Sequence, residues 1–212
     1  MVKRRMRKVY VITYPTPLEV HKIATIKDED YVIGVDQAVY YMYKQRIKVD
    51  LAVGDFDSLK HRSLLFGLQC EVLPSQKDIT DTFFALTKAF EISQDVTLIG
   101  GSGGTRIEHF YVHMMLFHHF PKMVMKTEFS VLRLIDQSTH IECDGFVNIF
   151  PYPEAIISLE GFEYPLDHYT LKPYDVLGIS NHVVMNTGKI LIHQGRILII
   201  ETKHIEDNKK SA

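Results

Sequence analysis

The segment DTFFALTKAFEISQDVTLIG, residues 81–100, joins a helical pattern to a short apolar run. Its first part, Asp81 to Ile92, spaces apolar side chains along one broad helix face, and its last part, Val96 to Ile99, is typical of a buried strand. The same alternation extends over roughly the first 125 residues. It adds strands at Val9 to Thr13, Tyr31 to Val35, Asp50 to Val53 and Cys70 to Leu73, and a helix from about Ile107 to Phe117. This alternation predicts a mostly parallel α/β sheet, whose ligands bind beyond the carboxyl ends of its strands.

The sequence changes character after Pro121. Short β-like runs separated by turn residues then dominate, and Gln194-Gly195 would close a hairpin. The runs are Phe129 to Ile135, His140 to Cys143, Ala155 to Leu159, Val176 to Ile179, Lys189 to His193 and Arg196 to Glu201. They predict an all-β sandwich or barrel of about 80 residues. We therefore expect two domains, an α/β domain over residues 1–126 and a β-sandwich over residues 127–212.

The composition excludes several classes of partner. The chain has 212 residues with 24 Lys and Arg against 26 Asp and Glu, which gives no electrostatic case for nucleic acid as the main partner. We expect no membrane span, because there is no stretch of about 18 consecutive apolar residues. Cys70 and Cys143 are the only cysteines and lack the spacing of metal ligands or of a disulfide framework. A soluble protein of the reducing cytoplasm is expected.

Two aspartates follow the third strand, in Gly54-Asp55-Phe56-Asp57-Ser58. In an extended chain the side chains at i and i+2 point the same way, so Asp55 and Asp57 would lie side by side, with Phe56 packed inward. Mg2+ would relieve their repulsion, because it binds one or two carboxylates together with phosphate oxygens and water. A metal and phosphate site is therefore the first hypothesis. A turn in which Asp57 or Ser58 caps a helix is the alternative.

A second polar segment, Ser75-Gln76-Lys77-Asp78-Ile79-Thr80-Asp81, lies directly before the helix at Asp81. Ser75, Asp78 or Thr80 could simply cap that helix. Capping does not require all the charged residues of this segment, and Asp78 and Asp81 would share one helix face. A carboxylate from this segment could complete the shell of the metal ion. Lys77 could neutralise phosphate oxygens.

The third segment, residues 99–109, connects a strand to a helix with the sequence IGGSGGTRIEH. Backbone amides of its four glycines can point at an anion at the helix N-terminus, and Arg106 adds a fixed positive fork. The run matches neither a Walker A loop nor the Gly-x-Gly-x-x-Gly fingerprint, and a flexible connection is the alternative. His109 and His113 are spaced as i and i+4, which is compatible with zinc. The His-Glu-x-x-His order is absent, so a polar pair on an amphipathic helix is the favoured interpretation.

Taken together and in this order, these segments resemble the thiamine pyrophosphokinase family, also called thiamine diphosphokinases. Gly54 to Ser58 match the family motif Gly-Asp-Phe-Asp-Ser, and Lys77 to Asp81 match Lys/Gln-Asp-x-Thr-Asp. Gly103 to His109 match Gly-Gly-Arg-x-Asp-His more loosely, because Thr105 is inserted and Glu108 replaces the aspartate. The first two motifs are highly specific as a pair.

The second half of the chain carries the same resemblance. Gly161 to Leu166 look like the family's Gly-x-x-Tyr-Pro-Leu signature, and Ser180-Asn181 look like its Ser-Asn signature. The resemblance implies an N-terminal α/β domain that binds ATP and Mg2+, and a C-terminal β-sandwich that binds thiamine. It also implies a homodimer with thiamine at the interface between domains of different subunits. Ser180 and Asn181 would lie near thiamine.

On the nucleotide side, Asp36 matches the aspartate of the family's Ala-Asp-Gly-Gly segment, although Val35 and Gln37-Ala38 depart from it. His113 stands where an Asn is usual. The resemblance assigns catalytic roles to Asp55, Asp57, Asp81 and Arg106, and Mg2+ binding to the first three. It assigns binding of ATP and its magnesium to Asp36, Lys77, Asp78, Thr80, Gly103, Gly104 and His109, and of thiamine to Ser180 and Asn181.

The implied reaction is attack of the thiamine hydroxyl on the β-phosphorus of ATP, with departure of AMP. One of the aspartates, for example Asp81, would accept the hydroxyl proton. Two alternatives remain open at this point. One is a non-catalytic protein that binds thiamine or thiamine diphosphate, and the other takes Asp55-Phe56-Asp57 as the Asp-x-Asp of a metal-dependent nucleotide-sugar transferase.

Overall fold

The structure is a computed structural model that describes residues 7–184 and 186–204. The chain divides into two compact units, an α/β unit that ends at Glu128 and a β unit that begins at Phe129. Within the described residues, every helix is too short or too polar to cross a lipid bilayer.

The described part of the α/β unit is built on one parallel sheet with the strand order β6-β5-β1-β2-β3-β4. The strands are β1 (Val9–Thr13), β2 (Tyr31–Val35), β3 (Leu51–Gly54), β4 (Cys70–Val72), β5 (Val96–Gly100) and β6 (Val124–Lys126). Every residue of β1, β3 and β5 is buried. Continuous burial is expected of parallel strands that are covered on both faces.

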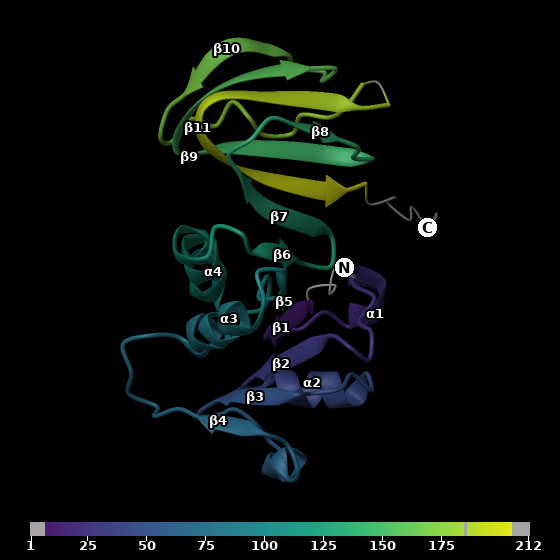
Figure 1. Ribbon diagram of the computed structural model, residues 1–212, viewed down its shortest axis with the longest axis vertical. Coiled ribbons are helices and arrows are strands. Elements are labelled where there is room, and N and C mark those ends of the chain that lie inside the picture. Colours follow the sequence, from purple (N-terminus) through teal and green to yellow (C-terminus); the bar gives the residue numbers. More distant parts are fainter. Residues whose placement is uncertain (1–6, 185, 205–212) are drawn as a thin grey trace, which may run out of the picture. The chain divides into compact units, whose positions relative to one another are not determined.

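Helices cover both faces of this sheet. They are α1 (Val20–Ile23), α2 (Ala38–Lys44), α3 (Asp81–Ile92) and α4 (Ile107–His119), with the 3-10 helix η1 at Arg62–Leu65. Figure 1 shows α3 and α4 on one side of the strands and α1 and α2 on the other. On the second side, Ala38 and Met42 of α2 pack in one buried cluster with Tyr10, Ile12 and Val32 of the sheet.

The order of the strands determines where a ligand can bind. From β1 the chain proceeds to β2, β3 and β4 on one side of the sheet, and β5 and β6 then lie on the other side of β1. The order reverses between β1 and β5, so the segments after these two strands separate at the carboxyl edge. In open α/β sheets this switch point is where ligands bind.

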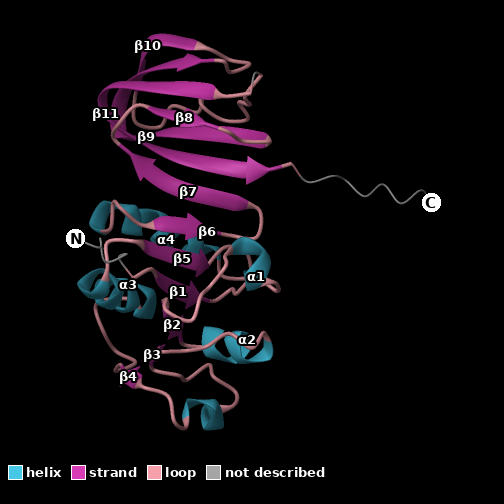
Figure 2. Cartoon of the chain, turned by 45° about the vertical axis from the view of Figure 1, so that its right-hand side comes forward, coloured by secondary structure: helices cyan, strands magenta, loops and turns pink. Residues whose placement is uncertain are grey.

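The β unit is a sandwich made by two long strands that pair over most of their length, β9 (Gly145–Glu160) and β11 (Gly188–Lys203). The C-terminal half of β9 and the N-terminal half of β11 form one layer with β8 (Thr139–Ile141) and β10 (Leu166–Leu171). Their other halves form the second layer with β7 (Ser130–Ile135). Figure 2 shows this strand-built unit, with β10 in one layer and β7 in the other.

Side chains from both layers share one core. Ile157 and Ile190 of the first layer pack in the same buried cluster as Val147, Ile149 and Ile199 of the second. The bend that separates the layers lies where the register of β9 and β11 shifts, between Ile192 and Ile197. The predicted fold class, a parallel α/β sheet followed by a β-sandwich, is confirmed.

Three predictions about elements of the second half need correction. Gln194-Gly195 does not close a hairpin, because β11 continues through both residues and Gly195 forms part of the bulge. The predicted strand at Val176 to Ile179 is wrong, since these residues lie in turns and bends outside any strand. Finally, β10 was not anticipated, and β9 extends ten residues before the predicted start at Ala155.

Candidate active site

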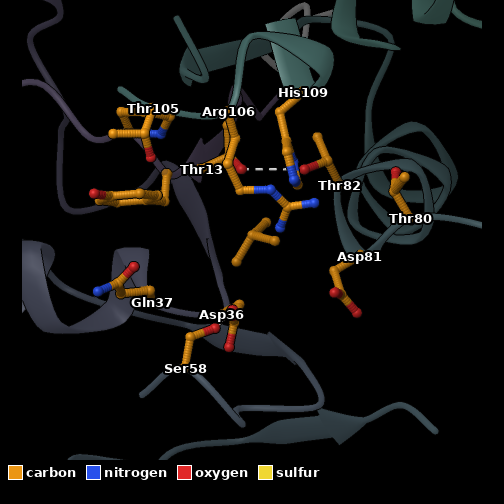
Figure 3. Close-up of a pocket in the computed structure, with 13 residues that line it drawn as sticks. Thr13, Asp36, Gln37, Ser58, Thr80, Asp81, Thr82, Thr105, Arg106 and His109 are labelled. Carbon is orange, nitrogen blue, oxygen red and sulfur yellow. Dashed lines mark hydrogen bonds between the residues drawn. The ribbon is translucent and has the colours of Figure 1, made fainter. Parts of the chain in front are cut away.

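A cavity of about 350 Å3 opens at the carboxyl edge of the parallel sheet, in the α/β unit. It collects the ends of β1 and β2, the first turn of α3 and the loop before α4, as Figure 3 shows. The cavity is lined by Thr13, Tyr14, Pro15, Val35, Asp36, Gln37, Ser58, Thr80, Asp81, Thr82, Thr105, Arg106 and His109. Five residues of the predicted site, Asp36, Thr80, Asp81, Arg106 and His109, therefore lie around one space.

Asp36 follows β2 and takes a left-handed backbone conformation, with φ 46°. One of its carboxylate oxygens, Oδ2, accepts a hydrogen bond of 2.6 Å from the Ser58 hydroxyl. The other, Oδ1, is buried and has no hydrogen-bond partner among the described residues. A buried carboxylate oxygen without a partner is costly in a protein, which is the behaviour expected of a group that binds a cation or a donor from a ligand.

The two aspartates after β3 do not point the same way, because the chain is not extended there. Phe56 takes a left-handed conformation with φ 57°, and its side chain is buried against the sheet as expected. Asp55 Oδ1 accepts a hydrogen bond of 3.1 Å from the Asp57 backbone N–H, which closes a tight turn. The carboxylate of Asp57 accepts hydrogen bonds from Arg62 at 2.9 Å and from the Ser75 hydroxyl at 3.0 Å. Asp57 thus contacts a different set of residues from Asp55.

The Lys77 ammonium lies between two of the expected metal ligands. Its Nζ is 3.6 Å from Asp55 Oδ2 and 3.2 Å from Asp81 Oδ1, and only 14% of the side chain is exposed. Burial raises the pKa of Asp81 above its ordinary value; Lys77 opposes this shift, and the charges of Asp55 and Asp36 add to it. The three carboxylates are therefore close enough to influence one another, and Lys77 compensates part of their charge.

The start of α3 brings two further hydroxyl groups to the cavity. Thr80 is the N-cap residue, and its side chain accepts a hydrogen bond of 3.1 Å from the Phe83 backbone N–H. Capping thus explains Thr80, as the alternative interpretation held. The Thr82 hydroxyl is 3.1 Å from that of Thr13 at the end of β1, the bond drawn in Figure 3. Asp78 is exposed and does not line the cavity, although it belongs to the predicted site.

The glycine loop between β5 and α4 is held in place by a buried histidine. Gly101 has φ 74°, and a Cβ there would come within 2.4 Å of the His113 ring. His113 Nδ1 donates a 3.0 Å hydrogen bond to the Gly101 carbonyl, and burial lowers the pKa of His113. This histidine is a structural group under the loop. The favoured view of His109 and His113 as a polar pair holds only for His109, which lines the cavity.

Arg106 and the outer glycines form the exposed rim of this loop. Arg106 Nε donates a 2.7 Å hydrogen bond to the Glu108 carboxylate, and the guanidinium remains largely exposed. Figure 3 shows the guanidinium of Arg106 pointing into the space between His109 and Asp81. Gly104 lies against Pro15, where a Cβ would come within 2.7 Å of the ring, and Gly103 lies in open space.

The carboxylates expected to bind Mg2+ do not form a compact cluster in the described part of the chain. Within residues 7–184 and 186–204, no group of three or more His, Cys, Asp or Glu side chains is gathered closely enough to hold a metal ion. The prediction that Asp55 and Asp57 lie side by side relied on an extended chain and is wrong, because the left-handed Phe56 turns Asp57 toward Arg62. The assignment of Mg2+ to Asp55, Asp57 and Asp81 came from the family resemblance and stays a prediction. The donor set that does face the Lys77 ammonium is Asp55 with Asp81, and both are hard oxygen ligands suited to Mg2+.

The two predicted thiamine residues of the β unit differ sharply. Asn181 is buried, and its side chain is occupied: Oδ1 accepts from the Tyr164 and His182 N–H groups, and Nδ2 donates to the Tyr164 carbonyl. Ser180 is exposed with φ 56°, and its backbone N–H donates to Asn148 Oδ1 at 2.8 Å. Asn181 therefore holds the Gly161 to Leu166 segment in place.

Comparison with known proteins gives this geometry a family. A model described as "Thiamin pyrophosphokinase, catalytic domain" matches residues 24–129, and one described as "Thiamin pyrophosphokinase, vitamin B1 binding domain" matches residues 134–197. The chain belongs to the thiamine pyrophosphokinase family. The predicted family is confirmed, and with it the expectation of an enzyme of the thiamine diphosphokinase type.

Individual relatives agree with the two family models. The chain is 29% identical to a protein named thiamine pyrophosphokinase from Bacillus subtilis over 189 residues, which cover 80% of this chain and 86% of the relative. Its fold is similar to the crystal structure of the thiamine pyrophosphokinase from Bacillus subtilis, with a TM-score of 0.80, 21% identity and coverage of 94% and 100% of the two chains. The structure of yeast thiamin pyrophosphokinase is similar with a TM-score of 0.68, 14% identity and coverage of 95% and 88%.

Among the lining residues of the cavity that sequence reasoning did not assign to the site are three with hydroxyl groups, namely Thr13, Tyr14 and Thr82. The strand that carries Thr13 was predicted, but no acidic or glycine-rich motif follows it. The signal was the topology itself, because the end of every parallel strand near the switch point reaches the same edge. Thr82 could have been found from its position one residue into the helix that begins at Asp81.

Proposed function

We propose that this protein transfers the pyrophosphoryl group of ATP to the hydroxyl of thiamine, giving thiamine diphosphate and AMP. The observation that carries the proposal is the pair Asp55 and Asp81 around the Lys77 ammonium, with Asp36 on the same cavity as Asp81, at the carboxyl edge of the family's catalytic domain. The thiamine oxygen would form a bond to the β-phosphorus, and the bond from that phosphorus to the oxygen that bridges it to the α-phosphorus would break. That oxygen leaves with AMP, and the hydroxyl proton passes to a base.

The carboxylates fit a magnesium ion. Asp36 Oδ1 is buried and lacks a hydrogen-bond partner among the described residues, and the buried Asp81 Oδ1 is paired with the Lys77 ammonium at 3.2 Å. Asp55 and Asp81 would hold the ion, with Asp36 beside them, whereas the contacts of Asp57 suit it to positioning the loop. Bound Mg2+ would neutralise the charge on the phosphate oxygens.

The other side chains of the cavity would align the substrates and stabilise charge. Arg106 can pair with phosphate oxygens through its planar guanidinium. Lys77 would stabilise the negative charge that develops on the pyrophosphoryl group during its transfer from ATP to thiamine. The hydroxyls of Thr13 and Thr82 offer further donors on the wall formed by β1 and α3. Asp81, whose pKa is raised by burial, is the candidate to take the hydroxyl proton.

We further propose a homodimer in which thiamine binds at the interface between domains of different subunits. The feature that supports this proposal is a run of exposed apolar side chains next to Ser180, namely Tyr174, Val176, Leu177 and Ile179, of which Tyr174 is 97% exposed. Exposed apolar patches of this kind are typical of surfaces that contact a partner. Ser180 would contribute its hydroxyl to thiamine, and Asn181 would support the site through its contacts with the neighbouring segment.

We also propose that the protein acts in a reducing cytoplasm. Its two cysteines are free and half-buried, which fits that compartment.

The test is to incubate the purified protein with thiamine, ATP and Mg2+ and to identify both products. Thiamine diphosphate with AMP supports the proposal, whereas ADP indicates transfer of a single phosphoryl group. Thermal stabilisation by thiamine without any AMP would favour the binding-protein alternative, because a ligand that binds only the native state raises its apparent stability. Release of a nucleoside diphosphate from a nucleotide sugar would favour the transferase alternative. Sedimentation equilibrium measures the oligomeric state.

A further inference from the structure

A second cavity of the α/β unit, of about 360 Å3, lies at the amino edge of the parallel sheet. Its walls come from α1 and residues 24–28, which precede β2, and from residues 45–48, which precede β3. We call it the amino-edge pocket. It is as large as the catalytic cavity of about 350 Å3, shares no lining residue with it, and lies at the other end of the strands. A ligand in this pocket would therefore be separate from the reacting groups.

The floor of the amino-edge pocket is apolar. Val20 and Ala24 are buried in the cluster that packs α1 and α2 onto the sheet, and Ile26 and Ile47 are half-buried against the same cluster. Sites for small organic molecules commonly combine an apolar lining with a few polar groups. The floor thus offers a surface for the apolar part of such a molecule.

Hydrogen bonds within the fold fix both walls of the pocket. Gln45 Oε1 accepts a 2.9 Å hydrogen bond from the Val20 N–H, and Gln45 Nε2 donates one of 2.8 Å to the Pro17 carbonyl. The Lys48 ammonium donates to two backbone carbonyls of the loop before β2. Because the walls are already ordered, a ligand would bind at a low cost in conformational entropy.

Two cations at the rim have no structural task. Lys27 and Arg46 line the pocket and are exposed, and their side chains make no hydrogen bond or ion pair with the described residues. Cations near the ends of helices often bind free carbonyls, and Lys48 has such a role here. Lys27 and Arg46 do not. Among the described lining residues Asp28 is the single carboxylate, so the rim has an excess of positive charge.

The backbone at Arg46 is unfavourable for an arginine. Arg46 follows Gln45, the C-cap of α2, and has a left-handed φ of 56°. The Ile47 N–H donates to the Met42 carbonyl at 3.0 Å, which completes the turn in which glycine or asparagine usually occupies the position of Arg46. Residues held in this conformation are found preferentially at binding sites. A task for the guanidinium would explain why a glycine is not used.

These observations together define the ligand. We infer that the amino-edge pocket binds a small organic phosphate, whose phosphate group is held by Lys27 and Arg46 and whose apolar part lies on the floor. A phosphate monoester carries about two negative charges at pH 7, which matches two free cations. A guanidinium can also donate two parallel hydrogen bonds to phosphate oxygens. This site goes beyond the proposed reaction and does not depend on it.

The first experiment titrates the full-length protein, labelled with 13C at its isoleucine methyl groups, with phenyl phosphate. Ile26 and Ile47 report on the amino-edge pocket, whereas Ile79 and Ile107 are adjacent in sequence to residues that line the catalytic cavity. We expect saturable shifts of the Ile26 and Ile47 signals. Benzyl alcohol, which keeps the ring but carries no charge, should bind at least about tenfold more weakly.

The second experiment removes the cations one at a time. Arg46→Gly deletes the guanidinium and suits the left-handed backbone, so Tm should not fall while Kd for phenyl phosphate rises about tenfold. Lys27→Ala should raise Kd to a similar degree. Lys22→Ala is the matched control, because Lys22 lies on α1, pairs with Glu19 at 2.7 Å and does not line the pocket. Its Kd should stay within about twofold of wild type.

Every other outcome overturns the inference. Shifts confined to Ile79 and Ile107 would place the anion in the catalytic cavity, and a lack of saturable shifts at Ile26 and Ile47 would show that the pocket does not bind it. Equal Kd values for wild type and Arg46→Gly, or for phenyl phosphate and benzyl alcohol, would contradict recognition by charge. None of these measurements requires turnover of thiamine or ATP, so the proposed function is tested separately.

Discussion

The α/β unit and the β unit treat their buried polar groups in opposite ways. At the cavity of the α/β unit, Asp36 Oδ1 is buried without a hydrogen bond from the described residues, and Asp81 Oδ1 is buried beside the Lys77 ammonium at 3.2 Å. In the β unit, the buried side chain of Asn181 makes three hydrogen bonds, two with Tyr164 in the segment it supports and one with the N–H of its neighbour His182. Both sets were predicted to contact ligands from their motifs. The structure thus distinguishes the carboxylates of the cavity, which remain available to a ligand, from the Asn181 amide, whose hydrogen bonds are made within the fold.

The physical basis of this difference is the cost of an unmade bond. A buried donor or acceptor without a partner costs about 1–3 kcal/mol, so a fold retains it only where a ligand can supply the partner. The same cost makes a satisfied group such as Asn181 important for stability. Substitutions in the α/β cavity should therefore affect activity, and a substitution at Asn181 should affect folding.

The largest effect is expected for Asp81→Asn. This substitution removes a charge that would hold the metal, and it should lower kcat/KM for thiamine diphosphate formation by about 10²–10³-fold. Burial raises the pKa of Asp81, which means that its charge is unfavourable in the fold, so Tm should not fall. Asp78→Asn is the matched control, since Asp78 is exposed and outside the cavity. Similar losses of kcat/KM in both variants would contradict a specific role of Asp81 in the cavity.

Asn181→Ala should show the converse behaviour. It leaves the N–H groups of Tyr164 and His182 and the Tyr164 carbonyl without partners, and it should lower the free energy of unfolding by about 2–4 kcal/mol in urea denaturation. Its neighbour provides the control, because Ser180 is exposed and Ser180→Ala should change stability by less than about 0.5 kcal/mol. Ser180→Ala should instead raise KM for thiamine. A stable Asn181→Ala with a raised KM would return Asn181 to the substrate site.

Lys77→Met tests whether the Lys77 ammonium and a divalent cation interact with the same carboxylates of the cavity. Without this ammonium, Asp55 and Asp81 repel each other, and a divalent cation relieves more repulsion than in the wild type. We expect kcat to fall about tenfold, as one charge contact to the reacting group is lost, and the rise of Tm on addition of Mg2+ to become larger. Lys88→Met is the control, because Lys88 pairs with Glu71 and Glu91 away from the cavity. An unchanged response to Mg2+ would mean that Lys77 and the ion do not share these carboxylates.

The fold of the α/β unit was largely predictable, and the reasons are local. β1, β2 and α3 begin and end at the predicted residues, because continuous apolar runs and a broad apolar helix face leave little choice. The β unit was less predictable. Val176 to Ile179 has the composition of a strand but lies in an exposed loop, while Leu166–Leu171 carries polar residues and is a strand. Pairing decided the second case, because β10 lies antiparallel to the C-terminal end of β9, the strand directly before it in the chain.

The site was predictable in its motifs and not in its geometry. Alternation of side chains placed Asp55 beside Asp57, and one left-handed residue, Phe56, cancelled that argument. A φ of this sign is uncommon for Phe, and the sequence carries no mark of it. Conversely, Thr13 and Tyr14 reach the cavity only because β1 lies next to the switch point, which depends on the strand order and not on any motif.

The smallest effect is expected for His113, the satisfied polar residue of the α/β unit. Burial lowers its pKa from the ordinary 6.5, so the folded protein keeps this histidine neutral while the unfolded chain takes up a proton. Its contribution to stability is therefore present above the ordinary pKa and is lost as pH falls through that value toward the lowered one. Asn at this position can still donate to the Gly101 carbonyl but does not titrate. The difference in unfolding free energy between wild type and His113→Asn, measured by urea denaturation between about pH 8 and pH 5, should thus shift in favour of the variant as the pH falls.

The exposed His118 on the same helix provides the control, because His118→Asn should show no such trend. A pH-independent difference for His113→Asn would mean that the glycine loop accommodates a charged imidazole. The α/β unit would then tolerate a poorly matched buried polar group, which the β unit is not expected to tolerate at Asn181.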